Sequence, residues 1–298
     1  MLTSAQFPRH LQVGIMLIYG MEYKEYPEEY SLVFDVMNST KAYEEIDSMV
    51  GFGLVPTKGE GKSIEYDEAF AGYTKRFTHV EYGLAFNITR PLWEDEQYGK
   101  IKRLPTALAK SVRQTVEILH ANVLNNAFDS SYPCPDAKEL CATDHPLKLG
   151  GTFSNELSVS ADFDVTSLEA ALIGIQNFVD DRGLKAFAQP RKLIIHPNDA
   201  FMAKQVLKSA QMPGVANNDI NPAQDILPEG FVTLHWLTDS DAWWIKTDVP
   251  NALISIWRRR PEFTRDNDWA SENGQFKTTF RVIQGPGDPR GIYGSPGA

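Results

Sequence analysis

Apolar residues recur at the spacing of one helix face between Lys100 and Phe128. They follow one another at steps of 3, 4, 4, 4, 3, 4 and 4 residues, at Ile101, Leu104, Leu108, Val112, Val116, Leu119, Val123 and Ala127. At a rise of about 1.5 Å per residue, one helix here would span roughly 40 Å. Proline disfavours helix at the residue before it, so we expect the regular helix to begin at Pro105, with Leu104 extended, and to loosen at Asn125–Asn126. The other positions are polar, and we expect them on the opposite face: Lys110, Arg113, Gln114, Glu117 and Asn122.

Residues 48–90 have the pattern of strands and turns. GFGLVPT (51–57), KGEGK (58–62) and the stretch from Ser63 to Arg90 predict a long β-hairpin with a glycine-rich tip. Every second residue is apolar in the later part of this stretch, at Val80, Tyr82, Leu84, Phe86 and Ile88. A two-stranded hairpin of this length is only marginally stable alone, so it must lie against another surface.

Residues 1–47 show no self-contained core pattern. They hold short apolar pieces around an acidic aromatic run, and the aromatic and apolar side chains would form an extended edge: Tyr23, Tyr26, Tyr30, Phe34 and Val36. We therefore expect an N-terminal arm that packs on the body of this subunit or of a neighbour.

A second module is predicted from about Asp162 to Val249, after a polar, proline-punctuated segment over 129–160. Thr166 and Glu169 form a capping box that opens a helix ending at Gly183. RKLIIHP (191–197) is a buried strand, and Asn198 caps a helix through about Ser209. A loop over 210–228 precedes a second predicted hairpin, FVTLHW (231–236) with AWWIKT (242–247). The module is of the α+β class.

Two more strands, ALISIWRRR (252–260) and GQFKTTFRVIQG (274–285), are expected to return the chain to a sheet beside the long helix. The remaining tail is rich in turn residues, so we expect it on the surface.

Composition and charge exclude several functions. The chain has 298 residues, a formal charge of −10 and an isoelectric point near 5.1, which argues against a protein whose main task is to grip nucleic-acid phosphates. The basic cluster Arg258–Arg260 is better interpreted as a solvated strand end or a subunit contact. No apolar run has the length of a membrane span, and Val13–Met21 lacks the flanks of a signal peptide, so no membrane partner is expected.

Three residues could hold a metal: Cys134, Cys141 and His145. A fourth ligand is not evident and the cysteine spacing is not one of the usual zinc pairs, so we predict no metal site; a local disulfide is the other alternative to free thiols. Among the histidines, Asp144–His145 and His196 are the best candidates for chemistry, although an isolated histidine is more often structural.

The acids Glu94, Asp95 and Glu96 precede the long helix, where carboxylates favour the positive helix end. A carboxylate-based hydrolase with a distant second acid is the enzymatic alternative. GEGKS (59–63) fails as a phosphate-binding loop because the first glycine of that motif would fall on Pro56. We predict no catalytic, cofactor-binding or metal residue, and a protein that is not an enzyme.

Five segments carry a resemblance to a known family: the hairpin over 51–90, DHPLKLGGTFSN (144–155), TSLEAALIGIQNFVDDRGL (166–184), PRKLIIHP (190–197) and DPRGIYG (288–294). Together they resemble the major capsid proteins of tailed bacteriophages of the Hong Kong 97 type, and more closely the Mu-like major head subunits. The resemblance implies an α+β fold with an N-terminal arm (1–47), an extended hairpin loop (48–90), a peripheral domain with a spine helix (91–160 and 250–298) and an axial domain (161–249).

The same resemblance implies a structural subunit that self-assembles as pentamers and hexamers of an icosahedral virion shell around packaged double-stranded DNA. The shell would assemble in the host bacterial cytoplasm. Further partners would be scaffolding, portal and decoration proteins, with weak non-specific contact to DNA. Some members of this fold link a hairpin lysine to a neighbour; Lys58 or Lys62 would occupy that place, but no acceptor can be assigned and we do not predict the bond.

The alternatives are an encapsulin-like protein compartment, which shares the shell fold, the hydrolase above, and a tail or decoration protein that binds a shell without forming one.

Overall fold

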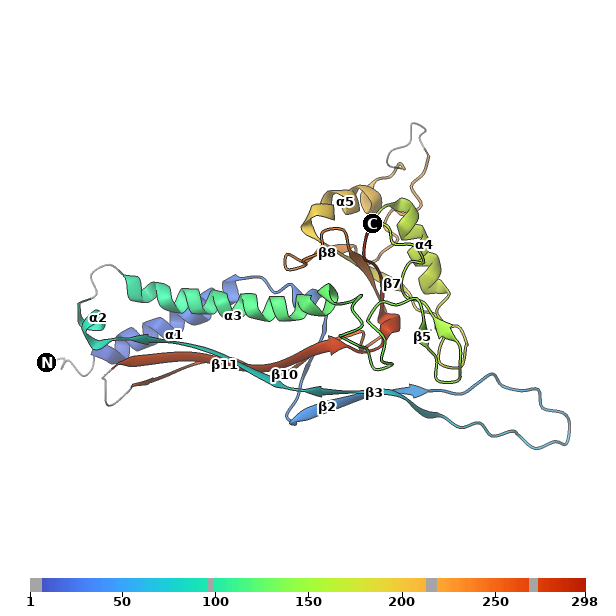
Figure 1. Ribbon diagram of the computed structural model, residues 1–298, viewed down its shortest axis with the longest axis horizontal. Coiled ribbons are helices and arrows are strands. Elements are labelled where there is room, and N and C mark those ends of the chain that lie inside the picture. The colour runs from blue at the N-terminus through green and yellow to red at the C-terminus, as the bar shows by residue number, and fades with distance from the viewer. Residues whose placement is uncertain (1–6, 96–98, 213–218, 268–272) are drawn as a thin grey trace.

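The structure is a computed structural model that describes residues 7–95, 99–212, 219–267 and 273–298. The molecule is elongated (Figure 1). At one end two helices lie along a sheet, a second sheet with its own helices stands beside them, and a long loop projects in the opposite direction. In the described part of the chain, no helix is both long and apolar enough to span a membrane.

The first sheet has the strand order β1-β10-β11-β4. It comprises β1 (Asp35–Asn38), parallel to β10 (Leu253–Asn267), then β11 (Gly274–Pro286) and β4 (Val80–Ile88), both antiparallel to their neighbours. One face is covered by α1 (Phe7–Glu25) and α3 (Lys100–Asn125) (Figure 1). The predicted return of the last strands to the sheet beside the long helix is confirmed. The shared core contains Leu108, Val112, Val116, Trp257, Phe280 and Val282.

The long helix begins a full turn before the predicted start. Pro105 lies inside α3, where it removes one backbone hydrogen bond, and Leu104 is helical rather than extended. Ile101, which is 1% exposed, packs there with Ile15, Ile88 and Phe276. Burial of this apolar cluster offsets the cost of the proline, so tertiary packing overrides the local preference.

Residues 7–25 are helical, so the extended aromatic edge predicted from Tyr23 to Val36 was wrong at its start, although Val36 lies in a strand. Tyr23 belongs to α1, and Tyr19, one turn earlier, stacks on Phe263 of β10 with ring centroids 4.6 Å apart. The chain then forms a short 3₁₀ turn, Tyr30–Leu32, and β1. Helix α1 buries its apolar face on α3 and the first sheet, a partner that the sequence of residues 1–47 alone does not reveal.

The extended loop differs from the predicted hairpin. Its two paired strands are β2 (Tyr43–Val50) and β3 (Phe70–Thr78), and residues 51–69 between them form no strand. The GFGLVPT segment therefore is not a strand. The alternating stretch after Thr78 is β4, which leaves the hairpin and joins the first sheet beside β11, because its aromatic side chains stack on those of β11 (Tyr82 on Phe280, Phe86 on Phe276).

The second sheet has the order β12-β9-β7-β8. Its central strand β7 (Pro190–Ile195) confirms the predicted buried strand, but β8 (Phe231–Thr233) and β9 (Trp243–Thr247) lie on opposite sides of β7 and do not form the expected hairpin. The edge strand β12 (Ile292–Ser295) is buried, so the expected surface tail was also wrong. Two helices, α4 (Val165–Gln176) and α5 (Ala200–Lys208), pack with this sheet in a second core.

The helix caps of this part are shifted from their predicted positions. The capping box of α4 is formed by Asp164 and Ser167 instead of Thr166 and Glu169. Before α5, residues Pro197–Asp199 form a 3₁₀ turn, and no side chain caps the helix. The remaining short elements are α2 (Arg90–Glu94), β5 (His145–Pro146), β6 (Thr152–Phe153) and the 3₁₀ turn Pro289–Gly291.

Candidate functional site

The loop that projects from β2 and β3 exposes a set of large apolar side chains. Val55 is 93% exposed and Tyr66 is 98% exposed, and the same holds to a lesser degree for Met49, Phe52, Leu54 and Ile64. Figure 1 shows the loop extending away from both sheets. Its charged tip contains a turn in which the Lys62 amide donates to the Gly59 carbonyl at 3.2 Å, with Gly61 at a φ of +76°. A group of large apolar side chains that their own chain leaves exposed is typical of a surface that contacts another molecule.

The base of the loop is fastened to the body through β3. Lys75 donates to the carbonyl of Pro133 at 2.7 Å, and the hydroxyl of Tyr73 donates to the carbonyl of Pro146 at 3.2 Å. The ammonium of Lys148 lies 3.9 Å from the centre of the Tyr73 ring. Desolvation lowers the pKa of Lys75, because its ammonium is enclosed between β3 and the polar segment. The loop therefore leaves the body from a fixed base.

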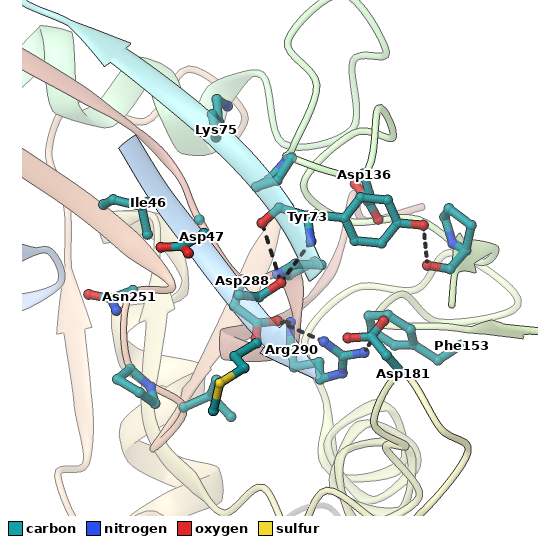
Figure 2. Close-up of a pocket in the computed structure, with 18 of the residues that line it drawn as sticks. Ile46, Asp47, Tyr73, Lys75, Asp136, Phe153, Asp181, Asn251, Asp288 and Arg290 are labelled. Atoms are coloured by element: carbon teal, nitrogen blue, oxygen red, sulfur yellow. Dashed lines mark hydrogen bonds and ion pairs between the residues drawn. The ribbon is translucent and has the colours of Figure 1, made fainter. Parts of the chain in front are cut away.

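A pocket of about 260 Å³ lies under this base, between β2, β3, the polar segment and the turn before β12. Figure 2 shows Arg290 pointing toward Asp181, with Asp288 beside it. The guanidinium of Arg290 contacts Asp181 at 3.3 Å and Asp288 at 3.4 Å, donates to the Val179 carbonyl at 2.8 Å, and lies 4.7 Å from the Phe153 ring centre. Two of the carboxylates that line this pocket, those of Asp181 and Asp288, are thus held by a cation of the same chain, while Asp47 and Asp136 line it as well.

His145 and the two cysteines are engaged elsewhere. The Nδ1 of buried His145 lies 2.6 Å from Oδ2 of Asp136, and its Nε2 lies 3.0 Å from Oδ1 of Asn155. The Asn155 amide group donates to the carbonyls of Leu140 and Pro289, both at 2.8 Å, and of Ile292, which fixes its orientation. Both ring nitrogens of His145 are thus occupied, and neither is directed at a metal.

Cys134 and Cys141 are free thiols in the first core. Burial raises the pKa of each well above its ordinary value, so both stay protonated. Over the described residues, no group of three or more His, Cys, Asp or Glu is arranged to hold a metal ion. The two cysteines form no disulfide with each other.

The acids before the long helix and His196, the other residues considered for catalysis, do not form a site among the described residues. Glu94 is exposed and pairs with Arg90 at 2.9 Å, within the short helix α2. Asp95 is exposed at the end of that helix, and Glu96 lies outside the described residues. Neither Glu94 nor Asp95 lines the pocket of Figure 2. His196 accepts a hydrogen bond from the Asn198 amide at the start of the 3₁₀ turn.

The basic cluster of β10 serves the subunit itself. Arg258 donates to the Ser39 carbonyl at 3.3 Å, Arg259 pairs with Glu81 at 2.6 Å, and Arg260 donates to the Tyr30 hydroxyl at 3.1 Å. The guanidinium of Arg260 also lies 4.6 Å from the Trp257 ring centre. These contacts tie Ser39, Tyr30 and Glu81 of β4 to β10.

Two charged residues of α3 have a role that the sequence did not indicate. Arg113 and Glu117 were placed on the polar face, yet they are 5% and 4% exposed. Glu117 accepts from the amides of Tyr30 and Glu29 at 3.0 and 3.2 Å, and Arg113 donates to Glu28 at 2.7 Å. Their position in the sequence could have indicated this burial, because Arg113 and Glu117 directly follow Val112 and Val116 of the apolar stripe.

A family model described as phage capsid protein matches residues 72–295. The chain belongs to the phage capsid protein family. It is accordingly a structural protein, a subunit of the icosahedral shell of a virion. No curated protein matches the chain.

Solved capsid structures share the fold over nearly the whole chain. The capsid of the native GTA particle is 12% identical with a TM-score of 0.60, covering 91% of this chain and 90% of that one. The virus-like particle of Pyrococcus furiosus is 9% identical with a TM-score of 0.57, covering 94% and 97%. The procapsid protein of bacteriophage JBD30 is 15% identical with a TM-score of 0.55, covering 99% and 76%. The predicted α+β capsid fold of the Hong Kong 97 type is confirmed.

Proposed function

We propose that this capsid protein assembles as pentamers and hexamers of a shell that encloses packaged double-stranded DNA. The observation that carries the proposal is the projecting loop, whose apolar side chains are left uncovered by their own chain. In a closed symmetric assembly, a projection on one copy meets a different surface on the next copy, and repetition of that contact closes a ring. Each contact can be weak, because a subunit held by several neighbours leaves only when all of them release it.

The chain is further proposed to belong to the Mu-like head subunits and to act without enzymatic activity. The proposed domain division is the arm over 1–47, the extended loop over 48–90, the peripheral domain over 91–160 and 250–298, and the axial domain over 161–249. The pairing of β4 with β11 supports moving residues 80–88 from the extended loop to the peripheral domain. The pairing of β12 with β9 supports grouping residues 292–295 with the axial strands.

Assembly in the host bacterial cytoplasm, with a separate scaffolding protein, a portal and decoration proteins, completes the proposal. The acidic balance of the chain, −10, fits a container whose contact with DNA is weak and non-specific.

Negative-stain electron microscopy after size-exclusion chromatography tests the proposal. We expect closed shells, or rings of five and six subunits, from the purified chain alone or with its scaffold. Nucleic acid inside shells recovered from infected cells supports the phage assignment, whereas protein cargo would support the encapsulin-like compartment. A subunit that stays monomeric at high concentration with scaffold would overturn the proposal.

A triple variant tests the loop itself. Leu54→Ser, Val55→Ser and Tyr66→Ser should each remove a contribution of up to about 1.5–3 kcal/mol from every contact in which that side chain is fully buried. Few or no shells should form, although the subunit keeps its fold, because these side chains touch no core. Val159→Ser is the matched control, since Val159 is 77% exposed in the segment before α4, away from the loop. Normal shells from the triple variant would remove the loop from the assembly contact.

A further inference from the structure

Arg182 lies within residues 161–249, the axial part of the chain, and contacts the projecting loop of the same chain. Arg182 lies in the turn between α4 and β7. The Asp180 side chain accepts from the amides of Arg182 and Leu184, both at 2.8 Å, and Gly183 has a φ of +78° that closes the turn. The Asp180 amide also donates to the Leu184 carbonyl at 2.7 Å. The backbone that carries Arg182 is therefore held on both sides, and its side chain is presented from a fixed place.

The guanidinium group of Arg182 binds the returning arm of the loop at two points, the carboxylate of Asp67 and the backbone carbonyl of Glu68. Its Nη1 lies 3.0 Å from Oδ2 of Asp67, and its Nη2 donates to Oδ1 of Asp67 at 3.2 Å and to the Glu68 carbonyl at 2.7 Å. The Phe70 ring centre lies 5.4 Å from the guanidinium carbon. Although the loop is exposed, the Arg182 side chain is only 14% exposed. A planar fork on a carboxylate fixes direction as well as distance.

Asp67 joins the two arms of the loop at the same point. Its Oδ2 accepts from the Gly53 amide of the outgoing arm at 2.7 Å, and its Oδ1 accepts from the Glu68 amide at 2.9 Å. A Cβ at position 53 would lie 3.2 Å from the Arg182 guanidinium, so glycine permits this close approach. The hydrogen bond from Gly53, together with those from Glu68 and Arg182, lowers the pKa of Asp67 and keeps its carboxylate charged at neutral pH.

The contact between Arg182 and Asp67, here called the clasp, is the outermost contact that holds the loop. Pairing of β2 with β3 ends at Val50 and Phe70, and the contact of Arg182 with Asp67 lies beyond that last pair. Within residues 54–66, all of which the structure describes, the one hydrogen bond is the turn between Gly59 and Lys62. Residues 54–66 therefore take their direction from the clasp and from the strands behind it.

We propose that Arg182 is a positioning residue, which sets the direction of the projecting loop relative to the axial part before a neighbouring copy binds. This inference rests on the proposed function, since it assigns the loop to the contact between copies. It also makes the loop direction depend on the axial part, because the clasp is the contact that joins the two. The loop with its exposed apolar side chains is thus held in one orientation in the free subunit, and little order has to be gained when it docks.

A distance measurement on the unassembled full-length chain tests the proposal. Spin labels on Lys62→Cys, at the loop tip, and Lys204→Cys, on α5, report the loop direction by pulsed electron resonance. The two native cysteines are buried, and the parent chain without added cysteines checks that they take no label. We expect one narrow distance peak for the parent, and a broad distribution for Arg182→Ala and for Asp67→Asn.

Arg76→Ala is the matched control, because it removes an exposed ion pair with Glu45 across β2 and β3 without touching the axial part. It should keep the narrow peak. Asp67→Asn changes only the exposed loop, so it tests the clasp even where Arg182→Ala fails to fold. A narrow parent-like peak in Asp67→Asn, or equal broadening in Arg76→Ala, would overturn the proposal. Failure of the parent to build shells would contradict the proposed function and would leave this distance result unaffected.

Discussion

The carboxylate of Glu117 accepts a hydrogen bond from the backbone amide of Tyr30 at 3.0 Å, across 87 positions of sequence. A second bond reaches it from the Glu29 amide. This buried carboxylate on the long helix thereby satisfies the backbone of the turn that leads from α1 into the first sheet. A charged residue inside a core stays where it satisfies such groups, because an unpaired amide there costs about 1–3 kcal/mol.

Glu117 should make the stability of the subunit depend on pH. Desolvation raises the pKa of this carboxyl from 4.5 to about 7, against the lowering effect of its hydrogen bonds. Between these values the folded state holds a proton that the unfolded state releases, so stability should fall by up to about 3 kcal/mol as pH rises through this window. Urea unfolding at a series of pH values measures the slope. Glu117→Gln should remove this contribution, so the stability of the parent relative to the variant should fall by up to about 3 kcal/mol between pH 4.5 and about 7. A difference between the two proteins that stays constant over this window would contradict the assignment.

His120 should contribute the opposite dependence. Desolvation lowers the pKa of this histidine to about 4, and its Nε2 lies 2.7 Å from the Ser255 hydroxyl of β10. Below about pH 6.5 the unfolded state gains a proton that the folded state excludes, so stability should fall with acid down to about pH 4. His120→Ala should lose this slope and about 2–4 kcal/mol of stability at neutral pH, because it empties a site between Tyr30 and Phe34. His196→Ala, outside the core, removes only the bond to the Asn198 amide and should cost no more than about 1 kcal/mol.

Two glycines within helices should respond oppositely to alanine. A Cβ at Gly174 of α4 would lie 2.7 Å from the ring of Tyr293, which is 4% exposed and whose hydroxyl donates to the Glu156 carbonyl. Gly174→Ala should therefore destabilise the chain by about 1–3 kcal/mol. Gly20 of α1 has open space at its Cβ, so Gly20→Ala should stabilise by up to about 1 kcal/mol. Thermal unfolding of both variants compares them, and equal effects would contradict this packing.

The tip of the loop should be needed for assembly and not for folding. Deletion of residues 58–63 removes the Gly59–Lys62 turn, which touches neither core. The expected product is a soluble subunit with an unchanged unfolding temperature that assembles poorly. Bulky residues at Gly59 and Gly61 should act in the same direction, since Gly61 has a positive φ. Normal shells from the deletion, viewed by electron microscopy, would show that the tip is dispensable.

Local signals carried much of the fold. The repeated 3- and 4-residue steps gave the existence of α3, because a helix with one apolar face has one way to bury it. The apolar run RKLIIHP gave β7, since a short β-branched run bounded by proline suits a buried strand. The family resemblance lay in segments spread along the chain, and the family match over residues 72–295 agrees with it.

Partners distant in sequence decided what those signals could not. FVTLHW and AWWIKT had strand patterns, but only the position of β7 shows that they flank a third strand. The burial of β12 likewise depends on pairing with β9 across about fifty residues. Arg113 and Glu117 looked like solvent-facing helix residues, because their backbone partners come from Tyr26 to Tyr30 and leave no local trace.

By itself the sequence determined the α+β class, the amphipathic spine, the projecting glycine-rich loop and the likeness to phage capsids. The first three follow from residue spacing or composition, which short segments carry, and the likeness is a resemblance that lies in segments spread along the chain. The tertiary structure alone decided the pairing of the sheets, the helix that replaces the expected N-terminal edge, and the clasp between Arg182 and Asp67. Those features join residues far apart in the chain, and their free energy arises only when the whole fold brings the partners together.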